Sequence, residues 1–164
     1  MPIRQLAVER FSIVSTKPFD HILRAIEGAI GHPSVVAMQR EIADAKTYPE
    51  LESVVRKATG PSDLMEFIRL NMGVILAKGQ AGSMRQSLRL LVGNPLIMRR
   101  MAEHVPDAAS YAPVTILIDE RADGVHVSYD RMASFLASYE SEAASTVAAD
   151  LDRKIESVLS AATH

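Results

Sequence analysis

The sequence predicts an α+β fold, an antiparallel sheet of about five strands with helices on one face. Runs rich in β-branched and aromatic residues alternate along the chain with segments whose apolar residues recur at helical spacing. Residues 112–131 have the pattern of a β-hairpin, which indicates antiparallel pairing. An amphipathic helix over residues 141–162 is long enough to cover one face of the sheet. The predicted order is β-α-(αα)-β-β-α-β-β-α, with the bracketed pair inserted.

Composition limits the possible functions. The chain has 164 residues, of which 48% are hydrophobic and 23% charged, so we expect a single globular domain over residues 1–164. The formal net charge of −2 argues against nucleic acid or an anionic membrane as a partner. The absence of cysteine excludes thiol nucleophiles and thiolate zinc sites. Without a leader-like segment or an apolar stretch of about 20 residues, a cytoplasmic protein is expected.

The first third of the chain predicts a strand followed by three helices. Residues 7–16, AVERFSIVST, are rich in β-branched and aromatic residues and predict the strand. Over residues 18–31 apolar side chains recur at helical spacing, Pro18 suits a first helical turn and Gly31 suits a helix end. Residues 33–60 contain two more apolar stripes at this spacing and predict a pair of short helices.

The middle of the chain predicts two strands and a corner. Residues 64–70 favour a strand and residues 73–78 a helical turn. A polar loop over residues 79–87 leads to the strand LRLLVG, in which side chains alternate. The sequence GNP at residues 93–95 then turns the chain into a helix that ends at Pro106.

Side-chain parity predicts the register of the hairpin. With a two-residue turn at residues 123–124, Ile118 opposes Tyr129. A three-residue loop would oppose Ile118 to Ser128 and mix the two faces, so we prefer the two-residue turn. The face away from the core then carries Thr115, Leu117, Asp119, Arg121, His126, Ser128 and Asp130.

Residues 87–160 resemble the prokaryotic family named domain of unknown function 302. The resemblance is carried by LRLLVGNPLIMRRMAEHVPDAASYAPVTILIDERADGVHVSYDRMASFLASY. This segment combines a strand that ends in an Asn-Pro corner, a helix, a short linker to a strand preceded by proline, and a hairpin that ends in an aspartate. The first strand and helix match more loosely, and residues 33–60 look like an insertion relative to shorter members.

The resemblance implies a fold similar to the TATA-binding-protein-like class, a curved antiparallel sheet packed against helices, often as a homodimer. It implies no activity, because none is established for the family. Many relatives carry Cys-Asn-Pro at the corner where this chain has Gly93-Asn94-Pro95. A thiol or metal role at that corner therefore does not extend to this chain.

The corner itself has two interpretations. Asn94 is a good N-cap and Pro95 a good first helical residue, so helix capping explains both. Alternatively, the free amides at the helix start bind an anion together with Arg99 or Arg100. We prefer capping, because no glycine-rich cradle accompanies the corner.

The polar face of the hairpin holds the densest group of side chains that can act in acid–base chemistry or ligand binding: Asp119, Arg121, His126, Ser128 and Asp130. In a cleft, such groups can perform acid–base catalysis. On an open sheet they form cross-strand ion pairs in solvent or a polar dimer contact. The open-sheet interpretation is preferred.

The segment YDRMASFLASY follows this face. Tyr129 is predicted to point toward the core, with Asp130 and Arg131 at the end of the strand and the apolar residues of 135–139 as a lid over one sheet edge. A cavity between sheet and long helix would then have polar groups at its mouth to orient a ligand. The preferred alternative is an ion pair at the end of the strand beside apolar side chains that pack against the sheet.

No motif predicts a metal or a cofactor. The five histidines show no HxH or HExxH spacing, and P-loop, GxGxxG and GxSxG patterns are absent. The GxxG at residues 79–82 precedes a strand in a slightly acidic chain, unlike an RNA-binding KH loop. The candidate ligand-binding residues are Asn94, Arg99, Asp119, His126, Tyr129, Asp130 and Arg131.

Three functions fit these observations. The first is a non-enzymatic cytoplasmic homodimer that binds a small molecule or a protein partner, and it predicts a pocket of mixed polarity. The second is a hydrolase or isomerase that uses Asp119 or Asp130 with His126 or Tyr129, two of which must then lie within hydrogen-bond reach in a cleft. The third is an interaction protein in which the methionine-containing helices and the inserted helical pair form the binding surface, and it predicts a large exposed apolar patch outside the dimer contact. We favour the first.

Overall fold

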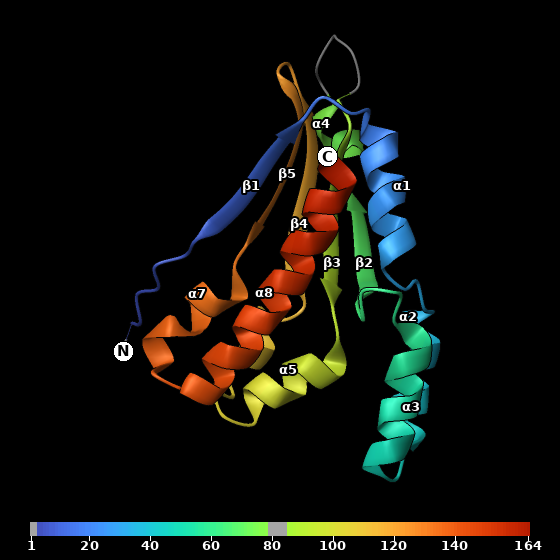
Figure 1. Cartoon of the computed structure of the whole chain (residues 1–164). Coiled ribbons are helices and arrows are strands. Elements are labelled where there is room, and N and C mark those ends of the chain that lie inside the picture. The colour runs from blue at the N-terminus through green and yellow to red at the C-terminus, as the bar shows by residue number, and fades with distance from the viewer. Residues whose placement is uncertain (1–2, 79–84) are drawn as a thin grey trace.

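The computed structural model describes residues 3–78 and 85–164 (Figure 1). Its centre is a five-stranded antiparallel sheet in the order β1-β5-β4-β3-β2. The predicted α+β fold with about five antiparallel strands is confirmed. The strands are β1 (Arg10–Ser15), β2 (Met65–Asn71), β3 (Ser87–Gly93), β4 (Val114–Arg121) and β5 (Gly124–Asp130).

Helices cover one face of this sheet (Figure 1). The longest, α8 (Glu142–Thr163), runs across the strands beside α1 (Phe19–Ala29), with α5 (Pro95–Ala102) and α7 (Met132–Leu136) at one end of the sheet. Both layers contribute fully buried side chains because apolar residues recur at helical spacing in α1 and α8 and at alternate positions in the strands. The main core includes Ile22, Ile26, Leu90, Ile116, Ile118, Val127, Leu151 and Ile155.

The two short helices predicted for residues 33–60 form a separate packed unit. They are α2 (Val35–Asp44) and α3 (Tyr48–Ala58), and they extend beyond one end of β2 (Figure 1). Thr47 and Glu50 form a reciprocal capping box that starts α3. The pair has its own small core of Met38, Val55 and Met65.

A close backbone contact joins this unit to the sheet. The N–H groups of Gly31 and Gly60 both donate to the carbonyl of Leu64, at 2.8 and 2.9 Å. A Cβ atom on Gly31 would lie 2.0 Å from the carbonyl oxygen of Ala58. Residue 31 must therefore be glycine because the two chain segments touch through their backbones.

Three further short helices complete the described chain. They are α4 (Met72–Leu76), α6 (Ala108–Tyr111) and the 3₁₀-helix η1 (Ala137–Tyr139). The strand-then-turn prediction for residues 64–78 is confirmed by β2 and α4. Within the described residues, no helix is long and apolar enough to cross a membrane.

The hairpin register differs from the prediction, although the faces are correct. The turn lies at residues 122–123, not 123–124, and Ile118 pairs with Val127 and not with Tyr129. The error is a shift of two positions, which preserves side-chain parity. Each residue of the hairpin therefore faces the side that the sequence predicted.

The physical reason for this shift in the hairpin register lies at Gly124. A type I′ turn at residues 123–124 needs a positive φ at both central positions, and Asp123 does not adopt one. Of these two residues, Gly124 has a positive φ, 136°, and it already pairs with Arg121 as the first residue of β5. A Cβ atom there would lie 2.7 Å from the carbonyl oxygen of Ser15, so β1 also requires a glycine at this position.

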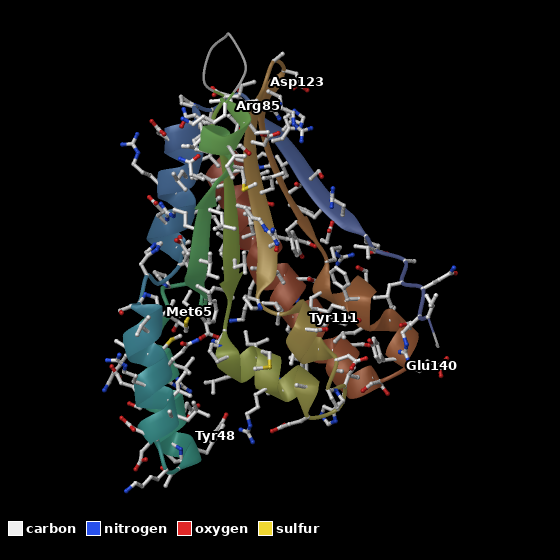
Figure 2. The ribbon with its side chains drawn as sticks, turned by 180° about the vertical axis from the view of Figure 1, so that it is seen from behind. Tyr48, Met65, Arg85, Tyr111, Asp123 and Glu140 are labelled. Atoms are coloured by element: carbon white, nitrogen blue, oxygen red, sulfur yellow. The ribbon has the colours of Figure 1, made fainter. Side chains whose placement is uncertain are left out.

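The described helices leave most of the other face of the sheet uncovered, with α4 at one end of it, and we call it the open face (Figure 2). Paired residues of antiparallel strands share a face, so the register assigns its members. They include Ile68, Leu70, Ser87, Arg89, Leu91, Thr115, Leu117, Asp119, His126, Ser128, Asp130, Arg10, Ser12 and Val14.

The glycine contact beside α3 gives a testable prediction. Gly31→Ala forces backbone atoms apart and should lower the free energy of unfolding by about 1–3 kcal/mol. Gly28→Ala is the matched control: it lies within α1, and its Cβ would meet nothing within 4 Å. This control should stabilise the protein by about 0.5–1 kcal/mol. Urea unfolding followed by circular dichroism measures the stability of both variants. Equal effects of the two variants would contradict the requirement for glycine at position 31.

Candidate functional site

The structure does not bring the seven candidate residues into one site. Asp119 and His126 are cross-strand neighbours at the turn end of the hairpin. Tyr129 and Arg131 both contact Glu156 at the opposite end of β5. Asn94 and Arg99 belong to a third location, the start of α5. Three separate groups therefore have to be considered.

At the corner, Asn94 serves the helix and the loop beside it. Its Oδ1 accepts a hydrogen bond of 2.8 Å from the N–H of Leu96, and Pro95 is the first helical residue. Its Nδ2 donates to the carbonyl oxygen and to Oδ1 of Asp63, at 2.9 and 3.1 Å. Asn94 is 5% exposed, so its polar atoms are occupied by the protein, as the capping interpretation predicts.

Arg99 is directed along the surface of α5. Its Nη2 lies 2.7 Å from Oε1 of Glu103, one helical turn later. Its guanidinium also lies over the ring of Tyr48, 4.6 Å from the centroid. These contacts link α5 to α3.

The turn end of the hairpin carries a buried carboxylate between two arginines. Asp119 is 4% exposed and accepts from Arg121 Nε at 2.8 Å and from Arg85 Nε at 3.1 Å, with Arg85 Nη2 as a further donor. Burial alone would raise the pKa of Asp119, but the hydrogen bonds from Arg121 and Arg85 outweigh it and lower the pKa. Asp119 therefore stays ionised, which makes it a poor general base.

His126 has a different carboxylate partner. It lies opposite Asp119 in the register, yet its Nε2 is 2.8 Å from Oδ1 of Asp123. The Asp123 side chain is 68% exposed, and Figure 2 shows Asp123 near Arg85 at this end of the sheet. The pair thus has hydrogen-bond geometry, but its carboxylate lies exposed on the turn and not in a cleft.

Tyr129 takes part in a buried network behind the sheet. Its hydroxyl donates to Oδ1 of Asp152 at 3.0 Å, and Asp152 also accepts from the N–H groups of Met132 and Ala133 at 2.7 and 2.9 Å. Burial, followed by the charge of Asp152, raises the pKa of Tyr129. The network fixes the start of α7 against α8.

The end of β5 forms ion pairs, as the preferred interpretation of this segment predicts. Nη1 of Arg131 lies 2.9 Å from Oε2 of Glu9, and its Nε lies 3.0 Å from Oε1 of Glu156. The carboxylate of Asp130 accepts two hydrogen bonds from Arg10. The space between sheet and α8 is filled by apolar side chains that include Val147, Leu151, Ile155 and Leu159. The space in which the alternative interpretation placed a cavity is therefore occupied by core side chains.

The predicted lid packs against a neighbouring helix. Phe135 stacks on Tyr111 of α6 with ring centroids 5.0 Å apart. The hydroxyl groups of Tyr111 and Tyr139 lie 2.8 Å apart, and Tyr139 also donates to Asp107. These bonds raise the pKa of Tyr139.

A cavity of about 380 Å³ lies elsewhere, between α1, α4 and the start of β3. It combines apolar side chains with carboxamides, and none of the seven candidates lines it. Sequence reasoning missed this location because it depends on how α1 and α4 meet around β3. Its lining residues are Phe19, Leu23, Asn71, Gly73, Val74, Arg85, Gln86, Ser87 and Leu88.

Comparison with known proteins supports the resemblance read from the sequence. Residues 38–162 match the family described as Domain of unknown function DUF302. The chain belongs to this family. The DUF302 match extends the resemblance of residues 87–160 toward the N-terminus and includes α3 and most of α2. That residues 33–60 are an insertion stays a prediction.

A solved DUF302 structure shares the fold. The crystal structure of an uncharacterized conserved DUF302 protein from Bacillus stearothermophilus aligns with a TM-score of 0.63. The alignment covers 94% of this chain and 98% of that chain, with 9% sequence identity. At this identity the similarity concerns the fold alone. No curated protein matches the chain.

The buried carboxylate of Asp119 predicts a pH-dependent stability difference. Its folded-state pKa is below the ordinary value of 3.8, so its stabilisation is present above that pH and is lost as the pH falls through the folded-state pKa. Asp119→Asn should lower the free energy of unfolding by about 1.5–3 kcal/mol at neutral pH. The difference from wild type should shrink on acidification below the ordinary pKa.

The control for this experiment is Asp130→Asn. Its ion pair with Arg10 is exposed on the arginine side, so the variant should cost about 0–1 kcal/mol. Urea unfolding at neutral and acidic pH measures both variants. An Asp119→Asn effect that is the same at both pH values would contradict the assigned role of the ion pair.

Proposed function

We propose that the protein is a non-enzymatic binding module that works as a homodimer and binds a small molecule or a protein partner. In this proposal two copies meet through the open face of the sheet. The observation that carries it is the uneven distribution of side chains over this face. The proposed location is the prokaryotic cytoplasm, as expected from the sequence and the family resemblance.

The open face has an apolar half and a polar half. On β2, Ile68 and Leu70 are 47% and 42% exposed, and Leu91 and Leu117 beside them are half-buried. The strands β5 and β1 present mainly serine, histidine and charged side chains on the same face. An apolar strip bordered by polar groups is typical of a protein contact surface.

Exposed apolar side chains are also concentrated in the sequence. Of the ten large apolar side chains exposed in the described residues, five lie within residues 68–76. They are Ile68 and Leu70 on β2 and Val74, Ile75 and Leu76 on α4. Ile68 and Leu70 belong to the apolar half of the open face, so their burial by a second copy would remove apolar surface from water.

The register indicates how two copies would meet. One row across the sheet holds Leu70, Arg89 and Leu117, and the next holds Ile68, Leu91 and Thr115. A two-fold axis that runs across the strands between these rows places Leu70 over the partner's Ile68 and keeps apolar strands on apolar strands. An axis along β4 would instead place the apolar β3 on the polar β5.

Acid–base catalysis has weaker support. The carboxylates of Asp119 and Asp130 both accept hydrogen bonds from arginines. Tyr129 is 2% exposed, and its hydroxyl is bonded to Asp152. His126 is bonded to the exposed Asp123, and this pair lies at the hairpin turn and not in a cleft.

The dimer can be tested by charge placement. Sedimentation velocity of the wild type should give about twice the monomer mass of 17.9 kDa. The double variant Ile68→Glu with Leu70→Glu should be monomeric, because the two-fold axis brings like charges together. The double variant Ile68→Lys with Leu70→Glu brings opposite charges together and should restore the dimer.

The control is Val36→Glu, which changes a side chain on α2 that is 61% exposed and should leave the dimer intact. Circular dichroism checks that each variant is folded. A monomeric wild type would overturn the dimer. If both double variants are monomeric, the proposed axis is wrong.

A further inference from the structure

We propose that the cavity between α1, α4 and β3 binds a small uncharged molecule with a mostly apolar body and a carboxamide-like group, which Asn71 and Gln86 recognise. The cavity volume of about 380 Å³ lies within the range of about 300–1,000 Å³ that small-molecule sites occupy. It opens on the helix-covered side of the sheet, away from the open face. The inference therefore names a ligand class and does not depend on the dimer.

The floor and walls of the cavity are apolar. Phe19 and Leu88 are 3% and 9% exposed and form the floor. Leu23 is half-buried and Val74 is exposed, and both belong to the walls. A ligand with an aromatic or aliphatic body would remove these surfaces from water.

Two carboxamides stand at the exposed rim. Asn71 pairs with Leu88 in the β2–β3 register, so its side chain lies on the cavity side of the sheet. Gln86 lies two positions before Leu88, which places its side chain on the same side. Both residues are exposed and line the cavity, so their polar groups are available to a ligand.

The orientation of Asn71 is set by the protein. Its Oδ1 accepts a hydrogen bond of 3.2 Å from the N–H of Val74, which starts α4. This contact uses one of the two lone pairs of the oxygen and leaves the Nδ2 group as a donor. Gln86 adds a donor and an acceptor on a backbone that is held to Glu120 by two hydrogen bonds. Together they match a carbonyl group beside an N–H group.

The cavity contains little charge. Among the described lining residues, Arg85 is the one with an ionisable side chain, and its Nε and Nη2 are committed to Asp119 on the open face. A ligand carboxylate would have to compete with Asp119 for Arg85, and an ammonium group would lose water without gaining an ionic partner. The chemistry of the lining therefore selects an uncharged ligand.

Three probes with one ring system test this selection. They are 2-naphthamide, 2-naphthoate and 2-naphthamidine, which are neutral, negative and positive at neutral pH. We expect saturable binding of naphthamide, measured by ligand-observed NMR, at least tenfold tighter than either charged analogue. Tighter binding of naphthoate or naphthamidine would overturn the neutral class while leaving the cavity as a site. Binding of none of the three would overturn the site itself.

Variants localise the binding. Gln86→Leu keeps a side chain of similar size and should weaken naphthamide binding about tenfold, the loss of one hydrogen bond. Gln39→Leu, on the exposed surface of α2, is the matched control and should leave binding unchanged. Equal affinities in both variants would show that naphthamide binds elsewhere and would overturn the assignment.

The same titration on the Ile68→Glu, Leu70→Glu variant separates the two proposals. Binding by a monomeric variant supports the cavity independently of the dimer. Loss of binding with monomerisation would show that the site is completed by the second copy, which overturns the assignment of the site to this chain alone.

Discussion

Burial of one face of the sheet under α8 and α1 is the interaction on which the rest of the structure depends. Ile116 and Ile118 on β4 and Leu151 and Ile155 on α8 are almost completely buried. Each such side chain contributes about 1.5–3 kcal/mol when it leaves water. Because the helices lie on one side, every second residue of each strand is left for the opposite side, and the open face results.

A single buried carboxylate fixes the layers against each other. Asp152 is 0% exposed, a position that is unfavourable for a charge unless donors surround it. The hydroxyl of Tyr129 and the N–H groups of Met132 and Ala133 provide those donors. The sheet, α7 and α8 thus meet at one side chain, and Tyr129 is committed to the fold.

Features that depend on local pattern could be predicted from the sequence, and features that depend on distant pairing could not. Helix α8 follows from the spacing of its apolar residues, and Asn94 follows from its position before Pro95. The hairpin faces follow from parity. The register does not, because Gly124 is fixed by contact with Ser15 of β1, far away in the sequence. Likewise, Asp119 and Arg85 are 34 residues apart and meet through the β3–β4 pairing.

The strand pleat explains why the charged cluster and the uncharged cavity can share the same end of β3. Arg85 and Ser87 lie at odd positions and interact with Asp119 on the open face. Gln86 and Leu88 lie at even positions and line the cavity on the helix side. The alternation directs the side chain of Arg85 toward Asp119 and the side chains of Gln86 and Leu88 toward the helix side, while Arg85 and Ser87 also border the cavity. A ligand in the cavity would therefore contact the backbone of a strand whose Arg85 side chain is paired with Asp119 on the far side of the sheet.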